Sequence, residues 1–171
     1  RVFVLDLASF SGLAGREMAC YAIFGLNGST DFLIGGFDLA IEGSASKLQI
    51  GTPTVDKLLQ SDLDLAGKVV RNQNGIAFEA FRLANRQFQT SIDGRYASTF
   101  SDLALLAKIH NLNTISEQAS GPLNVNVTVK GGGKSHALLA EVGVESGVLQ
   151  NRAVRRLAAQ FDGQINDKLL T

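Results

Sequence analysis

The fold of this chain is decided by residues 61–109, which read SDLDLAGKVVRNQNGIAFEAFRLANRQFQTSIDGRYASTFSDLALLAKI. The stretch divides into four segments in which apolar and polar residues alternate, as in strands with one apolar and one wet face. In the third segment Phe88 and Ile92 fall on one side, whereas Gln89 and Arg95 fall on the other. The stretch therefore predicts four consecutive antiparallel strands with a shared apolar face.

Short turns are expected between these segments. Asn74-Gly75 supplies the positive φ that a tight hairpin needs. Asn85-Arg86 can form the next turn. The alternation slips by one place at Phe81, which predicts a β-bulge in the second strand.

The rest of the chain continues the pattern of short strands. Residues 13–24 fit a helical turn or a strand, and we favour a strand; residues 153–161 fit a strand or a brief helix. Further strands are expected at residues 1–10, at 32–34 before Gly35-Gly36, at 37–42, at 47–50 as a short return strand, at 123–130 and at 136–145. The expected total is roughly ten to twelve strands, so the predicted class is all-β.

One short helix is expected in the segment TPTVDKLLQS, which begins at Thr52. Thr52 is the expected N-cap, and Asp56 favours the first turn. Pro53 fits the first helical position, because the N–H that proline lacks would have no partner within the helix there. Val55 and Leu58 give the helix one apolar side. A single helix of this length can plug one end of a groove or cover a sheet edge.

Composition excludes some classes of function. The chain has 171 residues, 45% of them hydrophobic, with 18 Gly, 2 Pro and no Trp, which is typical of short strands joined by glycine turns. Sixteen basic and sixteen acidic residues leave no net charge, so nucleic acid is not an expected partner. The sequence contains no apolar run of about 18 residues, so it predicts no membrane-spanning helix. Because the chain begins at Arg1 inside an apolar alternation, we expect it to be an excerpt of a longer protein.

Residues with the chemistry of an active site are scarce. His110 and His136 lack His or Cys partners at metal-ligand spacing. Asp62 and Asp64 resemble a carboxylate pair. Other acidic residues occupy equally regular positions on the polar side of the predicted strands, so a solvated face is the better interpretation. KGGGKS, from Lys130, lacks the spacing of a phosphate loop and leads into a strand. We therefore expect no enzyme, no metal and no cofactor.

The apolar face suggests a function through its energetics. We consider a sheet that curls into an open gutter with an apolar concave face. Each large side chain on that face then stays in contact with water and does not gain the roughly 1.5–3 kcal/mol that its burial would contribute. An acyl chain gains about 0.8 kcal/mol per buried methylene, so a tail of about sixteen carbons gains roughly 12 kcal/mol gross. The residues expected to line this lipid-binding groove are Leu39, Ile41, Leu63, Leu65, Val69, Ile76, Phe78, Phe88, Ile92, Leu103, Leu105, Ile109, Leu123, Val125, Val127 and Val129.

The same residues resemble the repetitive β segments of the TamB and AsmA-like family. That family's idiom is a short "G-P-x-D-x-L-L" helix, then "L-x-G-x-V", then "G-I/L-x-[FIL]-x-x-[FL]-R-[LV]" and "Q-x-x-x-x-G-x-[YL]-A". The matching positions are Gly51, Pro53, Asp56, Leu58, Leu59, Leu65, Gly67, Val69, Gly75, Ile76, Phe78, Phe81, Arg82, Leu83, Gly94 and Tyr96. Residues 120–129 and 146–157 fit the same idiom, so the resemblance covers 36–171 best and 1–35 less closely.

The resemblance implies the periplasmic β-taco region of an envelope protein of a diderm bacterium, with an inner-membrane anchor outside this chain. It implies phospholipid or another amphiphile as cargo, carried between the two membranes. It also implies assistance to outer-membrane protein assembly, with an outer-membrane barrel protein of the TamA type or unfolded β-strand clients as partners. The family's idiom contains no catalytic residues.

Two other classes stay open. The first is a purely structural β protein, such as an adhesin-like solenoid or a self-covered sandwich; a solenoid predicts a fixed repeat length, whereas the turn spacings here are irregular. The second is a slice of an outer-membrane barrel, whose apolar face carries aromatic girdles. With 2 Tyr and no Trp, this chain has no such girdle.

Overall fold

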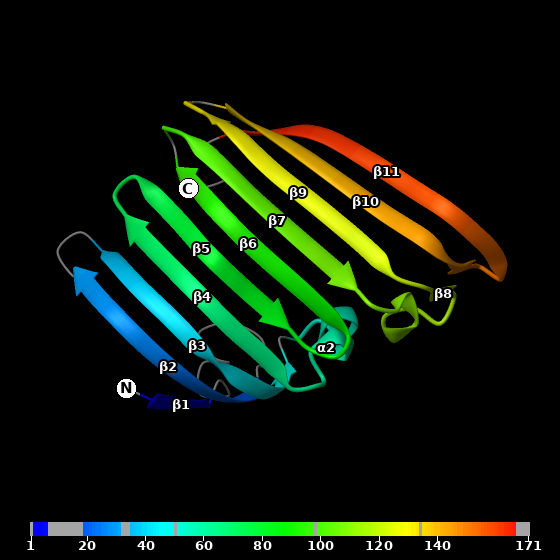
Figure 1. Cartoon of the computed structure of the whole chain (residues 1–171), viewed down its shortest axis with the longest axis horizontal. Coiled ribbons are helices and arrows are strands. Elements are labelled where there is room, and N and C mark those ends of the chain that lie inside the picture. Colours follow the sequence, from blue (N-terminus) through cyan, green and yellow to red (C-terminus); the bar gives the residue numbers. More distant parts are fainter. Residues whose placement is uncertain are drawn as a thin grey trace.

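The structure is a computed structural model, and it describes residues 2–6, 19–31, 35–49, 51–97, 99–133 and 135–166. These residues form a single antiparallel sheet of 11 strands, which confirms the predicted all-β class (Figure 1). The strand order is β1-β2-β3-β4-β5-β6-β7-β9-β10-β11, and β8 pairs with β10 beside this path. The elements are β1 (Val2–Asp6), β2 (Ala19–Asp31), β3 (Gly36–Gln49), α2 (Pro53–Leu58), β4 (Leu63–Asn72), β5 (Gly75–Ala84), β6 (Phe88–Ala97), β7 (Ser101–Ile109), η2 (Leu112–Thr114), β8 (Ala119–Ser120), β9 (Leu123–Gly132), β10 (Ser135–Leu149) and β11 (Arg152–Asn166).

The register of the sheet gathers the apolar side chains on one side. Residues directly opposite each other in antiparallel strands project to the same face. Ile92 lies opposite Leu105, which in turn lies opposite Val127. We call the face that carries Leu105 and its partners the apolar face, and the face that carries Asp102, Leu106 and their partners the polar face.

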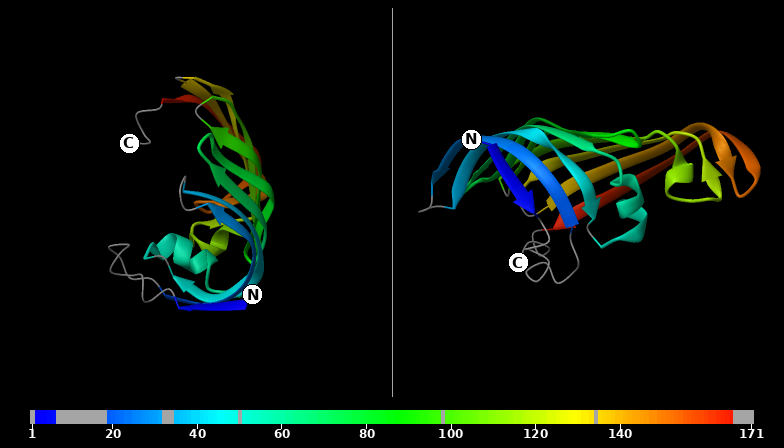
Figure 2. Two further views of the ribbon diagram at one scale, coloured as in Figure 1. Left: turned by 90° about the vertical axis from the view of Figure 1, so that its left-hand side faces the viewer. Right: turned by 90° about the horizontal axis from the view of Figure 1, so that it is seen from below.

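The sheet curls across its strands into an open gutter, and the apolar face is the concave one. Figure 2 shows α2 on the inner side of the crescent. Leu59, at the end of this helix, joins Ala45, Leu63 and Phe88 in one buried cluster. Since these three sheet residues belong to the apolar face, that face must line the inside of the curl.

The short helix forms where the sequence predicts it. Thr52 is the N-cap, and its carbonyl accepts a hydrogen bond from the Asp56 N–H at 2.8 Å, although its side chain makes no capping bond. Asn85, in the β5–β6 turn, donates from its amide to the Leu58 carbonyl at 2.7 Å. The helix is therefore fixed against one end of the apolar face, where β4 begins and β5 ends.

The predicted bulge in the second strand of the decisive stretch is confirmed. The pairing of β5 with β6 shifts between Phe78 and Phe81, and Ala80 adopts a φ of 47°. The Ala80 N–H donates to Asp93 Oδ2 at 2.9 Å, so a side chain satisfies the bulged amide. On the other side of β5 the register shifts near Gly67, where a Cβ would collide with the Phe81 Cα.

One predicted strand is wrong. A separate return strand at 47–50 does not form, because β3 runs without a break from Gly36 to Gln49. Gly43, in the middle of this strand, packs so closely on β2 that a Cβ would collide with the Ile23 carbonyl oxygen. The glycine therefore allows two strands to approach each other and does not reverse the chain.

The other predictions outside the decisive stretch divide into two groups. Residues 153–161 belong to β11, so the alternative of a brief helix is wrong there. Residues 2–6 and 19–31 are strands, whereas the predictions for 7–18 and 32–34 lie outside the described residues. The polar connector after β7 contains η2 and the two-residue strand β8, neither of which the sequence predicted. No helix of the described chain is long and apolar enough to cross a membrane.

Candidate functional site: an apolar concave face

All of the predicted lining residues lie on the apolar face. The pairings of β3 through β9 connect them across the sheet, strand by strand. One row runs across seven strands and consists of Leu39, Val69, Phe78, Gly94, Leu103, Val129 and Leu138. A second row consists of Phe81, Ile92, Leu105, Val127, Ala140 and Phe161. The structure thus brings all of these side chains into one continuous surface.

The sequence analysis left out other residues that lie on the same face. They are Phe24, Leu26, Phe37, Phe81, Leu83, Leu138, Ala140, Val142 and Val144. For β10 the signal was present, because its apolar residues alternate with Glu141 and Glu145. Phe81 and Leu83 lie beyond the predicted bulge, which moves the alternation by one place and returns both side chains to the apolar face.

Within the described chain, α2 is the only element that covers the apolar face, and it covers one end. There Leu63 is 3% exposed and Phe88 is 9% exposed. Away from the helix, Leu105 and Val127 remain half-buried, although strands flank them on both sides. Their remaining exposure faces the inside of the gutter, so hydrophobic surface is left for another molecule to cover.

The end of the apolar face opposite α2 is more polar. Ser101 is fully buried, and its hydroxyl accepts from the Ala97 N–H and donates to the Ala97 carbonyl, each at 3.0 Å. His136 is also fully buried, and its ring lies 5.1 Å from the ring of Tyr96, centroid to centroid. The gutter is therefore bounded by a helix at one end and by polar side chains at the other.

The polar face carries a ladder of charges. Lys68 Nζ lies 3.0 Å from Asp38 Oδ2 and 3.7 Å from Glu79 Oε2, so one ammonium joins β3, β4 and β5. The hydrogen bond to Asp38 is the main cause of the raised pKa of Lys68. Lys130 and Asp102 form a looser pair at 4.0 Å between β7 and β9. These contacts agree with the interpretation of this side as a solvated face.

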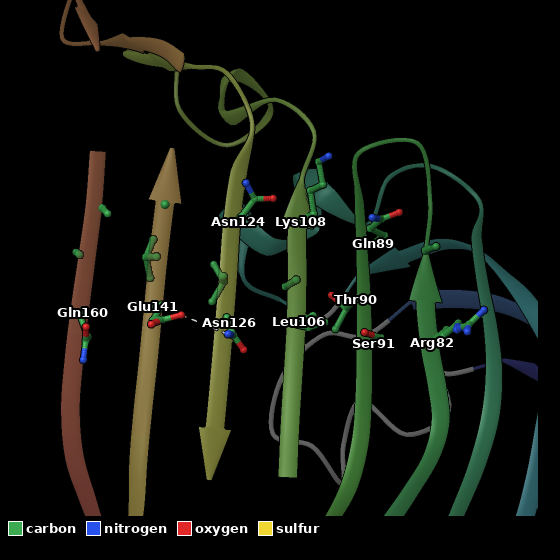
Figure 3. A pocket seen from close by; sticks show the side chains of 17 residues that line it. Arg82, Gln89, Thr90, Ser91, Leu106, Lys108, Asn124, Asn126, Glu141 and Gln160 are labelled. Atoms are coloured by element: carbon green, nitrogen blue, oxygen red, sulfur yellow. Dashed lines mark hydrogen bonds between the residues drawn. The ribbon is translucent and has the colours of Figure 1, made fainter. Parts of the chain in front are cut away.

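A hollow of about 980 Å³ lies over the polar face between β5 and β11 (Figure 3). Its lining includes Arg82, Lys108 and Glu141 together with several amides. Asn126 donates to Glu141 Oε2 at 3.3 Å. The lining also contains Leu106, Val125, Val142 and several alanines, so it mixes polar and apolar groups. The apolar face is the stronger candidate site, because its apolar side chains form continuous rows across the sheet that water cannot satisfy.

Neither histidine belongs to a cluster that could hold a metal ion. Within the described residues no group of three or more His, Cys, Asp or Glu side chains lies close enough together. His110 Nδ1 instead lies 3.0 Å from the Arg86 carbonyl oxygen, which links the end of β7 to the β5–β6 turn.

The fold and this face define the class of the protein as an open, curled antiparallel sheet with one apolar concave face. No protein-family model, no curated protein and no solved structure matches the chain. The resemblance to the TamB and AsmA-like family therefore depends on the sequence idiom alone.

Proposed function

We propose that this chain is a hydrophobic β-gutter of a bacterial envelope protein of the TamB and AsmA-like type, which shields phospholipid acyl chains as they pass between two membranes. The observation that carries this proposal is the continuous apolar concave face, which among the described elements only α2 covers. The periplasm is the compartment that fits such a carrier, and its membrane anchor would lie outside this chain.

The size of the face supports an acyl chain as its occupant. The row from Leu39 to Leu138 crosses seven strands, and neighbouring strands lie about 4.8 Å apart, so the row is roughly 29 Å long. A tail of about sixteen carbons that lies against it gains roughly 12 kcal/mol gross, before the cost of ordering the chain. Its headgroup can remain in water at the open mouth of the gutter.

The same face can take an unfolded β-strand of an outer-membrane protein, whose alternate apolar side chains match it equally well. In that case the chain assists outer-membrane protein assembly, with a barrel protein of the TamA type as the acceptor. A structural module without cargo is the alternative to both. A self-covered sandwich is disfavoured, because within the described residues no second sheet faces this one.

A photo-crosslinking experiment tests the proposal. A crosslinking amino acid is placed at Leu105 on the apolar face, and at Leu106 and Asp102 on the polar face of the same strand. Leu106 is the sharper control, because it is equally apolar and 53% exposed but points to the opposite side. We expect lipid adducts at Leu105 alone, measured by mass spectrometry after purification from cells.

The outcomes distinguish the candidates. Protein adducts at Leu105 would identify a strand client in place of lipid. If Leu105 forms no adduct with either, and native mass spectrometry finds lipid-free protein, the proposal of a carrier fails. Equal lipid labelling at Leu105 and Leu106 would also contradict it, because the contact would then be non-specific.

A further inference from the structure

The hollow over the polar face, which we call the polar-face hollow, has the size of a ligand-binding site. Its volume of about 980 Å³ lies within the usual range for such pockets, about 300–1,000 Å³ (Figure 3). Small residues, Ala84 and Gly143 among them, leave room between the longer side chains. Most of the lining comes from β5, β6, β7, β9 and β10, each of which is paired on both sides. The polar-face hollow therefore does not depend on an edge of the sheet.

Two neighbouring rows of side chains cross the polar-face hollow at right angles to the strands. In one row Lys108 lies between Gln89 and Asn124. In the other row Leu106 lies opposite Asn126. The lining reaches from β5 to β11, so at about 4.8 Å per strand the rows are roughly 24 Å long. This shape suits an extended ligand that lies across the strands.

The depression continues beyond β5. A second hollow of about 510 Å³ lies over β2 to β5 on the same face, and it shares Arg82 and Ala84 with the first. An elongated ligand can therefore extend past the polar-face hollow without leaving the depression.

Side-chain amides give the polar-face hollow its hydrogen-bonding character. An amide both donates and accepts, as a hydroxyl group does, whereas an ammonium only donates and a carboxylate only accepts. Within the described chain no other residue hydrogen-bonds to the side-chain amides of Gln89 and Asn124. Asn126 Nδ2 donates to Glu141 Oε2 at 3.3 Å, which orients its Oδ1 as an acceptor for a ligand. These amides match a ligand that carries many hydroxyl groups.

An apolar side chain lies among these amides. Leu106 is 53% exposed, and its cross-strand neighbours on this face are Ser91 and Asn126. A ligand that covers Leu106 must therefore present C–H groups close to its hydroxyl groups. A sugar ring has this combination, with hydroxyl groups around its edge and C–H groups on its faces.

The charges of the depression favour a neutral ligand. The polar-face hollow contains two cations, Arg82 and Lys108, and one anion, Glu141. The second hollow adds two anions, Glu42 and Asp64. Two cations against three anions leave no strong field of either sign, so a nucleic acid or a polyphosphate is disfavoured.

A peptide is disfavoured for a different reason. Extended peptides bind by adding a strand to an open sheet edge, where they find unpaired backbone groups. In the polar-face hollow β6, β7 and β9 each pair with a strand on both sides. Their backbone groups are therefore already used within the sheet.

We propose that the polar-face hollow binds a neutral linear oligosaccharide, which crosses the strands with one sugar ring on Leu106. The side-chain amides of Gln89, Asn124 and Asn126 bind its hydroxyl groups. This site goes beyond the proposed lipid carrier, because it lies on the opposite face of the sheet. Saccharide and lipid can therefore be bound at the same time, and neither depends on the other.

Calorimetric titration tests the proposal with a panel of linear hexasaccharides built from glucose, mannose, galactose or N-acetylglucosamine. We expect at least one of them to bind. Leu106→Ala removes the contact with the sugar ring, and Asn124→Ala removes an amide, so each should weaken binding by about fivefold or more. In nuclear magnetic resonance spectra the side-chain amide signals of Gln89 and Asn126 should shift during the titration.

Thr128→Ala is the matched control. Thr128 lies on the same strand and the same face as Asn124 and Asn126, but outside the lining of the polar-face hollow. It should leave the affinity for the saccharide unchanged. Leu105→Arg, on the apolar face, should also keep the saccharide bound, even where lipid is lost. Circular dichroism verifies that each variant is folded.

Three results would overturn the inference. The first is that no hexasaccharide of the panel binds. The second is binding that Leu106→Ala and Asn124→Ala leave unchanged, or that Thr128→Ala weakens as much, since the saccharide would then bind elsewhere. The third is loss of the saccharide in Leu105→Arg, which would place it on the apolar face.

Discussion

The two ends of the apolar surface differ in what covers them. Beside α2, Leu63 is 3% exposed and Ala45 is 5% exposed, whereas on β11 Leu157 is 49% exposed and Phe161 is 60% exposed. All four side chains belong to the same face and come from the same alternating pattern. In a sheet of one layer, the burial of a side chain therefore depends on the neighbouring strands and on the helix that covers it. An apolar side chain is not buried merely because it is apolar.

Leu63→Ala should have the largest effect on stability, because it removes the centre of the cluster beneath α2. We expect a loss of about 2–4 kcal/mol in the free energy of unfolding, measured by denaturant titration. Leu106→Ala on the polar face, where the side chain is 53% exposed, should change it by less than about 0.5 kcal/mol. Similar losses in both variants would contradict the division into a covered and an open region.

Gly94→Ala should be the next most costly change. Gly94 lies in the middle of the apolar row with a φ of +106°, and a Cβ there would collide with the Asp102 carbonyl oxygen. Gly133→Ala is the control, since its φ is +76° but nothing lies within 4 Å of the added Cβ. We expect about 2–3 kcal/mol for Gly94→Ala and about 1 kcal/mol for Gly133→Ala, by thermal or denaturant unfolding.

Leu105→Arg and Val127→Asp distinguish an open gutter from a covered core. Because both positions are half-buried and face the inside of the curl, the variants should fold with a loss of about 1–2 kcal/mol and lose bound lipid. Co-purified lipid is measured by extraction and mass spectrometry, with Leu106→Arg as the control that should keep it. Variants that simply unfold would show that these residues belong to a closed core.

Lys68→Met should have the smallest effect. The raised pKa of Lys68, caused first by its hydrogen bond to Asp38, means that its contribution to stability is present at neutral pH. This contribution is lost as the pH rises through the raised folded-state pKa, above the ordinary 10.5. The variant should therefore unfold at a slightly lower temperature at pH 7, and the difference should disappear at strongly alkaline pH. A difference that grows with pH would contradict this account.

The candidate site shows how far local patterns reach. Alternation alone was enough to place Leu105, Val127 and the other lining residues on one face, because the side-chain period of a strand is two wherever it lies in the sheet. The slip at Phe81 predicted the bulge, although Phe81 and Leu83 beyond it were not included among the lining residues. The prediction failed at 47–50, where a return strand was expected but β3 continues from Gly36 to Gln49.

The sequence by itself determined the all-β class, the four central hairpin strands, the short helix after Thr52 and the membership of the apolar face. These features depend on φ preferences, capping and period, all of which act over a few residues. Only the tertiary structure decided that α2 covers the apolar face at the end where β4 begins, and that β3 runs without a break from Gly36 to Gln49. Those outcomes depend on the accumulated twist of many strands and on pairings between distant segments, so no short stretch of sequence contains them.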